Sequence, residues 1–164
     1  MVDTIRQNLQ NLNTQIAQDV TLVAVSKTKP NEAILAAYES GHRIFGENKV
    51  QEMTRKWEEL PRDIQWHFIG HLQTNKVKYI VPFVSLIHSL DSVKLANEID
   101  RQGARHRRII DCLLQIKIAK EPEKYGFSQE EALSFLESLN TNPLPYRSEE
   151  HTSELQSPCN LVCR

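Results

Sequence analysis

Apolar and polar positions alternate along the chain with two different periods. At the start of the chain apolar side chains recur every three or four positions, at Ile5, Leu9, Leu12 and Ile16, as in an amphipathic helix. Short, nearly continuous apolar runs are typical of strands buried under helices. These runs predict strands at 21–26, 43–46, 64–70, 84–90 and 108–118. The helical pattern predicts helices at 3–18, 30–41, 48–60 and 74–81, and two more after Asp91 or Ser92 and after Ser128.

Residues with special backbone preferences agree with these boundaries. Pro30 suits the first turn of a helix and Gly41 suits the end of one. Ser128 is followed three residues later by Glu131, which predicts a capping box at the start of the last helix.

The strict alternation of strand and helix indicates an α/β fold with parallel strands. Two architectures remain compatible with five strand–helix units. One is an open, doubly wound sheet, and the other is a partial eight-stranded (β/α)8 TIM barrel. A complete barrel typically takes about 250 residues, and five units in about 146 residues scale to that size.

Composition narrows the class of protein. The 164 residues include 20 Lys and Arg and 21 Asp and Glu, a net charge of -1, which argues against a nucleic-acid-binding protein. No apolar run reaches membrane-spanning length, the N-terminus lacks a signal-peptide core, and three cysteines do not make a disulfide framework. We therefore expect a cytoplasmic protein without a membrane partner.

The last 18 residues have no period of either kind. The segment RSEEHTSELQS, which begins at Arg147, resembles the conceptual translation of a sequencing-library adapter. We therefore expect residues 1–146 to form the domain and 147–164 to be a non-native, disordered tail. The histidine and cysteines of this tail are too few for a closed zinc site, and no metal site is expected.

Lys27 is the most informative single residue. It follows the first strand directly, and ligands bind at the carboxyl ends of parallel strands. Partial burial there would lower the pKa of the amine and make it a nucleophile toward aldehydes. The alternative is an ordinary solvated lysine in a loop.

The neighbouring strand ends place further polar side chains on the same rim. Asn48 follows the second strand, and His67 and His88 lie in the third and fourth. They would line a pocket above Lys27 if they point inward; otherwise the histidines are core or rim residues. A basic cluster at 101–108 is expected to be a solvated loop on the opposite face.

Five segments occur in the order typical of one known family. They are VAVSKTKP, FGEN with VQE, WHFIGHLQTNK, IHSLDS and EKYG, at 23–30, 45–52, 66–76, 87–92 and 123–126. Together they resemble the pyridoxal phosphate homeostasis protein (YggS-like) family over essentially all of residues 1–146. The resemblance implies a partial TIM barrel of the alanine racemase N-terminal type, with an N-terminal helix and the first five βα units.

The same resemblance implies a cofactor and its site. Pyridoxal 5'-phosphate would be held as a Schiff base on Lys27. The matching positions near the cofactor are Asn48, His67, Asn75, His88, Ser89, Lys29 and Lys124. The family holds the cofactor phosphate through groups from its last strands, and this sequence contains no counterpart of that phosphate cup.

The resemblance implies a role in vitamin B6 homeostasis without an established turnover reaction. The expected partners are pyridoxal 5'-phosphate and apo-enzymes that require it, and full-length members are expected to be monomers. One alternative is an amino-acid racemase or lyase of the alanine racemase fold that depends on this cofactor. Another is a cofactor-free α/β binding module.

Overall fold

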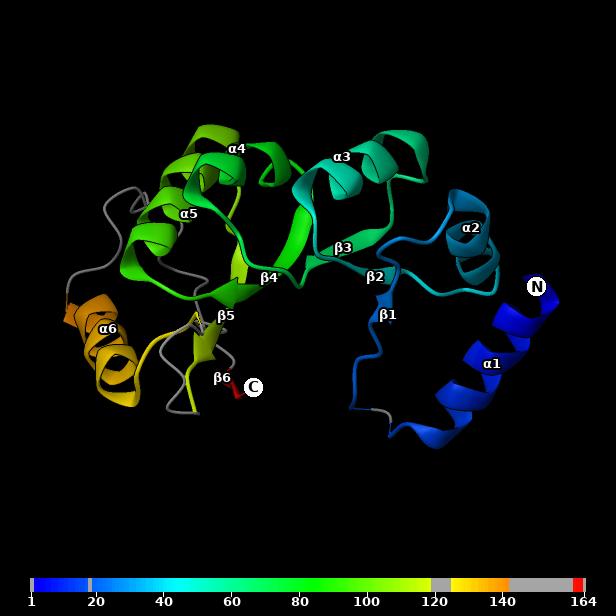
Figure 1. The fold of residues 1–164 in the computed structure, drawn as a ribbon, viewed down its shortest axis with the longest axis horizontal. Helices are drawn as coiled ribbons and strands as arrows, with labels where there is room; N and C mark the ends of the chain where they lie inside the picture. The colour runs from blue at the N-terminus through cyan, green and yellow to red at the C-terminus, as the bar shows by residue number, and fades with distance from the viewer. Residues whose placement is uncertain (1, 18, 119–124, 142–160, 164) are drawn as a thin grey trace.

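The computed structural model describes residues 2–17, 19–118, 125–141 and 161–163. Six strands form one parallel sheet in sequential order, as Figure 1 shows. They are β1 (Ala24–Val25), β2 (Ile44–Glu47), β3 (Gln65–Phe68), β4 (Val84–Leu90), β5 (Asp111–Ile116) and β6 (Leu161–Cys163).

The helices follow the outer side of the curved sheet (Figure 1). The first, α1 (Val2–Gln15), precedes β1. Those between the strands are α2 (Asn31–Glu39), α3 (Val50–Glu59), the 3-10 turn η1 (Thr74–Lys76), α4 (Val77–Ile80), α5 (Val93–His106) and α6 (Gln129–Thr141). Each of the five predicted strand–helix units is therefore present.

The core lies between the sheet and these helices. Trp66 and Phe68 of β3 are buried in it with Met53 of α3 and Ile80 of α4. Because side chains alternate across a strand, His67 between them faces the other side of the sheet. The sheet thus has an apolar side covered by helices and an inner side that carries polar groups.

The strand order distinguishes the two architectures that the sequence left open. A doubly wound sheet reverses its order at a switch point, whereas here every strand pairs with its neighbours in the sequence. This order is that of a TIM barrel. Among the described strands β1 and β6 do not pair, so the sheet is an open arc, and the prediction of a partial barrel is confirmed.

Local boundaries agree well with the sequence. Ser92 accepts a hydrogen bond from the amide of Leu95 at the start of α5. The capping box at α6 is also present: the amide of Glu131 donates to Ser128 Oγ at 3.1 Å, and the amide of Ser128 donates to Glu131 Oε2 at 2.8 Å. The predicted strand at 21–26 is reduced to two paired residues, because β1 is an edge strand with a single neighbour.

Three residues of the tail are described. Leu161–Cys163 form β6 alongside β5, whose free edge can pair with a short extended segment. The other described residues end at 141, so most of the tail lies outside them, and its non-native, disordered character stays a prediction.

The expectation for the basic cluster was wrong. It is not a loop, because its first six residues belong to α5, and Arg108 donates to the carbonyls of Val81 and Val84.

Two classes of feature are absent from the described part of the chain. It contains no helix long and apolar enough to cross a membrane. Its histidine, cysteine and carboxylate side chains also form no group of three that could hold a metal ion.

Candidate functional site

Lys27 occupies the second position of a tight turn that follows β1. The amide of Lys29 donates to the carbonyl of Ser26 at 3.0 Å and closes the turn. The third residue, Thr28, has a φ of 63°. The side chain of Lys27 is exposed rather than partly buried, so the expectation of desolvation was wrong: the turn carries it beyond the packed end of the strand.

A fully buried lysine lies directly beneath this turn. Lys56 of α3 donates from Nζ to the carbonyl of Ser26 at 2.8 Å, to Glu47 Oε1 at 2.8 Å and to Glu52 Oε1 at 2.7 Å. Neither Lys56 nor Glu47 has any exposed side-chain surface. The hydrogen bond from Lys56 is the main cause that holds the pKa of Glu52 below its usual range. We call Lys56, Glu47 and Glu52 the buried ionic cluster.

The strand register brings three predicted site residues to one level of the sheet. Val25 pairs with Gly46, Gly46 with His67 and His67 with Leu86. Two residues further along each of three strands lie Lys27, Asn48 and His88. Lys27 and Asn48 thus lie just beyond the carboxyl ends of β1 and β2, at the level of His88, which lies inside β4 two residues before its end.

His67 and His88 form a direct pair on that side. His67 Nδ1 lies 3.0 Å from His88 Nε2, a hydrogen bond in which one ring donates and the other accepts. Burial, together with the repulsion from a charged His88, lowers the pKa of His67 to about 4. His67 is consequently neutral near pH 7 and can serve as a hydrogen-bonding group but carries no charge there.

Gly70 fixes the backbone of Asn48 by close approach. A Cβ atom at Gly70 would lie 2.3 Å from the carbonyl oxygen of Asn48. Only a glycine therefore allows the chain after β3 to pack against the chain after β2. This contact helps to place Asn48 at the rim.

The remaining predicted residues are distributed less closely. Ser89 is buried in β4, with no described hydrogen-bond partner for its hydroxyl. Lys29 is exposed beside Lys27, and Lys124 lies outside the described residues. Asn75 is exposed in η1 and lines a groove of about 540 Å³ between α3 and α4.

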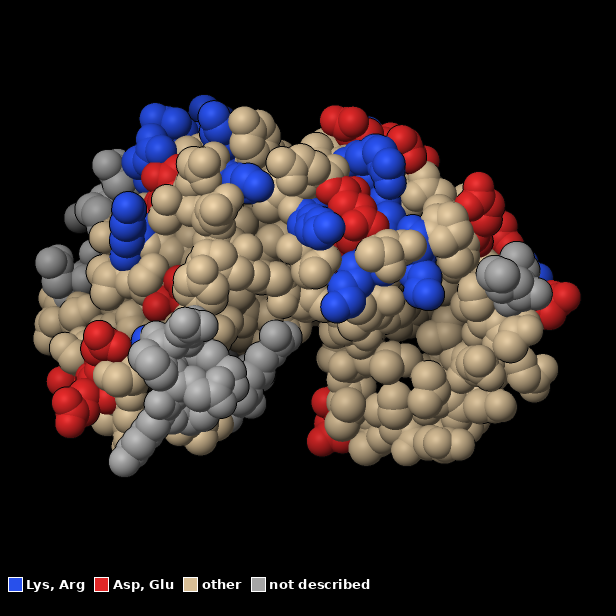
Figure 2. All heavy atoms as spheres, in the orientation of Figure 1, with Lys and Arg blue, Asp and Glu red and all other residues tan. Residues whose placement is uncertain are grey.

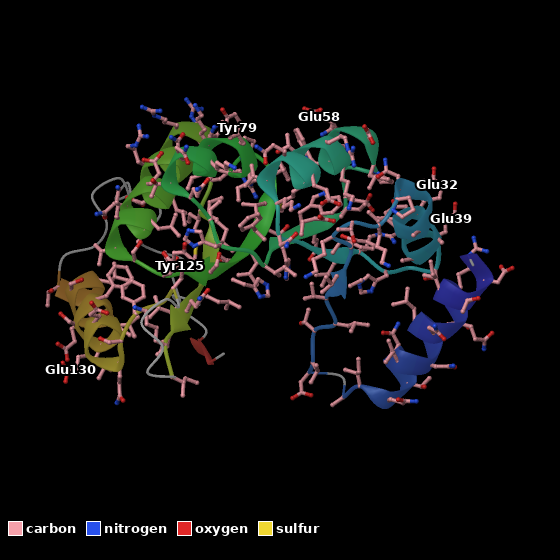
Figure 3. The ribbon with its side chains drawn as sticks, in the orientation of Figure 1. Glu32, Glu39, Glu58, Tyr79, Tyr125 and Glu130 are labelled. Atoms are coloured by element: carbon pink, nitrogen blue, oxygen red, sulfur yellow. The ribbon has the colours of Figure 1, made fainter. Side chains whose placement is uncertain are left out.

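That groove lies on the outer, helix-covered side. Figure 2 shows basic and acidic side chains together over α3, and Figure 3 shows Glu58 and Tyr79 on this side. Both of these residues line the groove with Asn75. The structure thus groups Asn75 with the helices and not with the histidine pair, and its role near a cofactor stays a prediction.

Sequence reasoning missed the buried ionic cluster. The helix 48–60 is rich in charge, and charged residues there are ordinarily solvated. Lys56, however, lies three residues after Met53 and four before Leu60, both of which are buried. Its place on the apolar stripe was the signal that could have identified it.

The comparisons with known proteins identify the relatives of this chain. The family model described as "Alanine racemase, N-terminal domain" matches residues 1–149. The pyridoxal phosphate homeostasis protein of Aquifex aeolicus is 44% identical over 110 residues, which are 66% of this chain and 48% of that protein. The chain thus spans about half the length of this relative.

Solved structures agree with the sequence matches. PipY of Synechococcus elongatus with pyridoxal phosphate (PLP) bound is 37% identical, with a TM-score of 0.78, over 87% of this chain and 66% of that one. Alanine racemase of E. faecalis is 14% identical, with a TM-score of 0.68, over 87% of this chain and 39% of that one. The second likeness shows the fold alone.

Proposed function

The chain belongs to the alanine racemase N-terminal domain family, among its pyridoxal phosphate homeostasis (YggS-like) proteins, and on this premise we propose that it binds pyridoxal 5'-phosphate as a Schiff base on Lys27. The observation that carries the proposal is the exposed amine on a fixed turn at the carboxyl end of β1. The named function of the relatives and the PLP-bound PipY structure support the choice of cofactor.

The residues on the inner side fit the aldehyde and ring end of this cofactor. Lys27 offers a primary amine, and the cofactor when bound supplies an aldehyde that condenses with amines. Asn48 offers amide donors and an acceptor at the same level. The neutral His67, paired with His88, adds polar groups without adding charge. Ser89 is next to His88 in β4 and is buried, with no described partner for its hydroxyl, and its place near the cofactor stays a prediction.

Each of these residues has a distinct part in holding the cofactor. Lys27 is the covalent attachment point, and Asn48 and the histidine pair orient the ring. Because attachment through an imine is reversible, such a protein can store the cofactor and release it. We therefore propose a carrier in vitamin B6 homeostasis rather than an enzyme, with PLP-requiring apo-enzymes as the recipients.

Borohydride trapping tests the attachment. The purified chain is titrated with pyridoxal 5'-phosphate, reduced and digested, and the modified lysine is located by peptide mass spectrometry. We expect the label at Lys27, its loss in Lys27→Ala, and its retention in the matched control Lys29→Ala. A label that is equal in Lys27→Ala and wild type would refute the attachment site.

Two further assays separate the alternatives. Incubation of the cofactor-loaded protein with amino acids would reveal a racemase or lyase through racemised amino acid or keto acid, and we expect neither. If titration of the protein with pyridoxal 5'-phosphate leaves the absorbance of the cofactor unchanged, a cofactor-free binding module is favoured. Transfer to an apo-enzyme, followed by the recovery of its activity, tests delivery.

Location and assembly complete the proposal. We propose a cytoplasmic protein that is a monomer when full length. We also propose that it does not bind nucleic acid, in keeping with the near-zero net charge. Sedimentation of the cofactor-loaded full-length protein tests the monomer. A change of sedimentation on addition of DNA or RNA would show that the protein does bind nucleic acid.

A further inference from the structure

The turn that carries Lys27 is held from both sides by the same helix. On one side, the carbonyl of Ser26 accepts a hydrogen bond from Lys56 Nζ at 2.8 Å. On the other side, the amide of Thr28 donates to Glu52 Oε1 at 2.7 Å. Lys56 and Glu52 are themselves joined at 2.7 Å, one turn apart on α3. The backbone before and after Lys27 is thus tied to a single point on α3.

The backbone conformation of Thr28 is one that needs neighbouring contacts to hold it. Its φ of 63° lies in the left-handed region, which a β-branched residue rarely adopts. A positive φ at the third position of a turn ordinarily calls for glycine or asparagine. A strained residue persists only where its surroundings determine the conformation, and here Glu52 holds its amide.

The buried ionic cluster is also more polar than packing alone requires. An apolar residue at position 56 could fill the same space without the cost of removing charges from water. Lys56 instead has no exposed side-chain surface, and it contacts Glu47, whose Oε1 also accepts from the hydroxyl of Ser26 at 2.6 Å. Lys56 is therefore linked to the turn in three ways. It donates directly to the carbonyl of Ser26, and it contacts the Ser26 hydroxyl through Glu47 and the Thr28 amide through Glu52.

We propose that Glu52 and Lys56 are positioning residues for Lys27. They fix the backbone of residues 26–28 and thereby the direction in which the Lys27 side chain extends from the end of β1. This role rests on the proposed function, because Lys27 is the group whose direction matters. Neither residue is expected to touch the cofactor. Their effect is to select Lys27 over the exposed Lys29, two residues away, as the site of attachment.

Substitutions at Glu52 test this role, with Glu58 as the matched control. Glu52→Ala removes the acceptor for the Thr28 amide, whereas Glu52→Gln keeps an oxygen at the same distance. Glu58 lies on the same helix, points outward in Figure 3 and is exposed, so Glu58→Ala controls for the loss of a carboxylate from α3. Glu52→Asp shortens the side chain while it keeps the charge, and it replaces the alanine variant if that variant does not fold.

Two readouts are measured on the full chain. The first is hydrogen exchange of the Thr28 amide without cofactor, which we expect to accelerate roughly 10- to 100-fold in Glu52→Ala, as for the loss of a hydrogen bond to a charged group. The second is the ratio of Lys27 to Lys29 label after trapping with pyridoxal 5'-phosphate and borohydride. We expect this ratio to fall in Glu52→Ala and Glu52→Asp, and to be largely restored in Glu52→Gln.

The outcomes separate this role from the proposed function. If the wild type takes no label at Lys27, the proposed attachment fails, and the exchange rates alone decide whether Glu52 holds the turn. If the wild type is labelled at Lys27 while the label ratio or the Thr28 exchange rate is the same in all variants, the positioning role is wrong. A change of equal size in Glu58→Ala would overturn it as well.

Discussion

His67 Nδ1 and His88 Nε2 lie 3.0 Å apart on the inner side of the sheet and join β3 to β4 through their side chains. The two rings are tilted by 49° with their centres 5.1 Å apart. A hydrogen bond between two imidazoles requires that at least one ring be neutral, since two charged rings would both present donors. The pair is therefore sensitive to acid.

Acidification is expected to destabilise the protein through His67. Its pKa in the folded chain is about 4, below the ordinary value of about 6.5 that applies to the unfolded chain. The folded state thus binds fewer protons, and stability is lost as the pH falls from about 6.5 through 4. After screening by water the loss is on the order of 1–3 kcal/mol. Denaturant unfolding at several pH values measures it.

A variant comparison assigns this pH dependence to the pair. His67→Asn cannot titrate, so the loss of stability between pH 6.5 and 4 should become smaller. The control His106→Asn removes an exposed histidine at the end of α5, outside the pair, and so controls for the loss of a histidine as such. An equal slope in wild type and His67→Asn would show that other groups cause the acid sensitivity.

Lys27→Arg is expected to abolish covalent attachment although it keeps the positive charge. A guanidinium stays protonated and does not act as a nucleophile toward an aldehyde. The turn itself should survive, because the contacts with Glu52 and Lys56 are made by the backbone of neighbouring residues. The absorbance of the cofactor-loaded protein measures the result. Attachment that persists in Lys27→Arg would point to another amine, and Lys29→Arg serves as the control.

Gly70→Ala is expected to displace Asn48. The new Cβ would meet the backbone of Asn48, which cannot rotate away as a side chain does. We expect a loss of about 1–3 kcal/mol in unfolding free energy, as for overpacking. Gly46→Ala is the matched control, because its Cβ would meet only the side-chain ends of Ile69 and Val23, at 3.2 Å. Equal losses in the two variants, measured by denaturant unfolding, would contradict this explanation.

Lys56→Met is expected to cost about 3–5 kcal/mol, because it leaves the buried carboxylate of Glu47 without its cation. A double variant with Glu47→Gln should recover part of that loss, since the uncompensated charge is then removed. Denaturant unfolding of both variants measures the difference. Additive effects of the two substitutions would show that the two side chains do not interact.

Only part of the candidate site could be predicted from the sequence. The apolar runs placed Lys27 and Asn48 at strand ends and His88 inside a strand, and the register brings the three residues to one level. The direct contact of His67 with His88 could not be predicted, because it depends on how β3 and β4 align. Asn75 lies in the same segment as His67 but faces a groove on the helix side. Order along the chain does not determine on which side of the sheet a residue lies.

The sequence by itself determined what depends on near neighbours: the alternation of strands and helices, the end of α2 near Gly41, and the capping box of Ser128 and Glu131. These features follow from the backbone preferences and hydrogen bonds of residues a few positions apart. The tertiary structure decided the sequential strand order, the pairing of Leu161–Cys163 with β5, and the burial of Lys56. Each depends on groups distant in sequence, and Lys56 can be buried only because folding brings Glu47 and the turn after β1 to its amine.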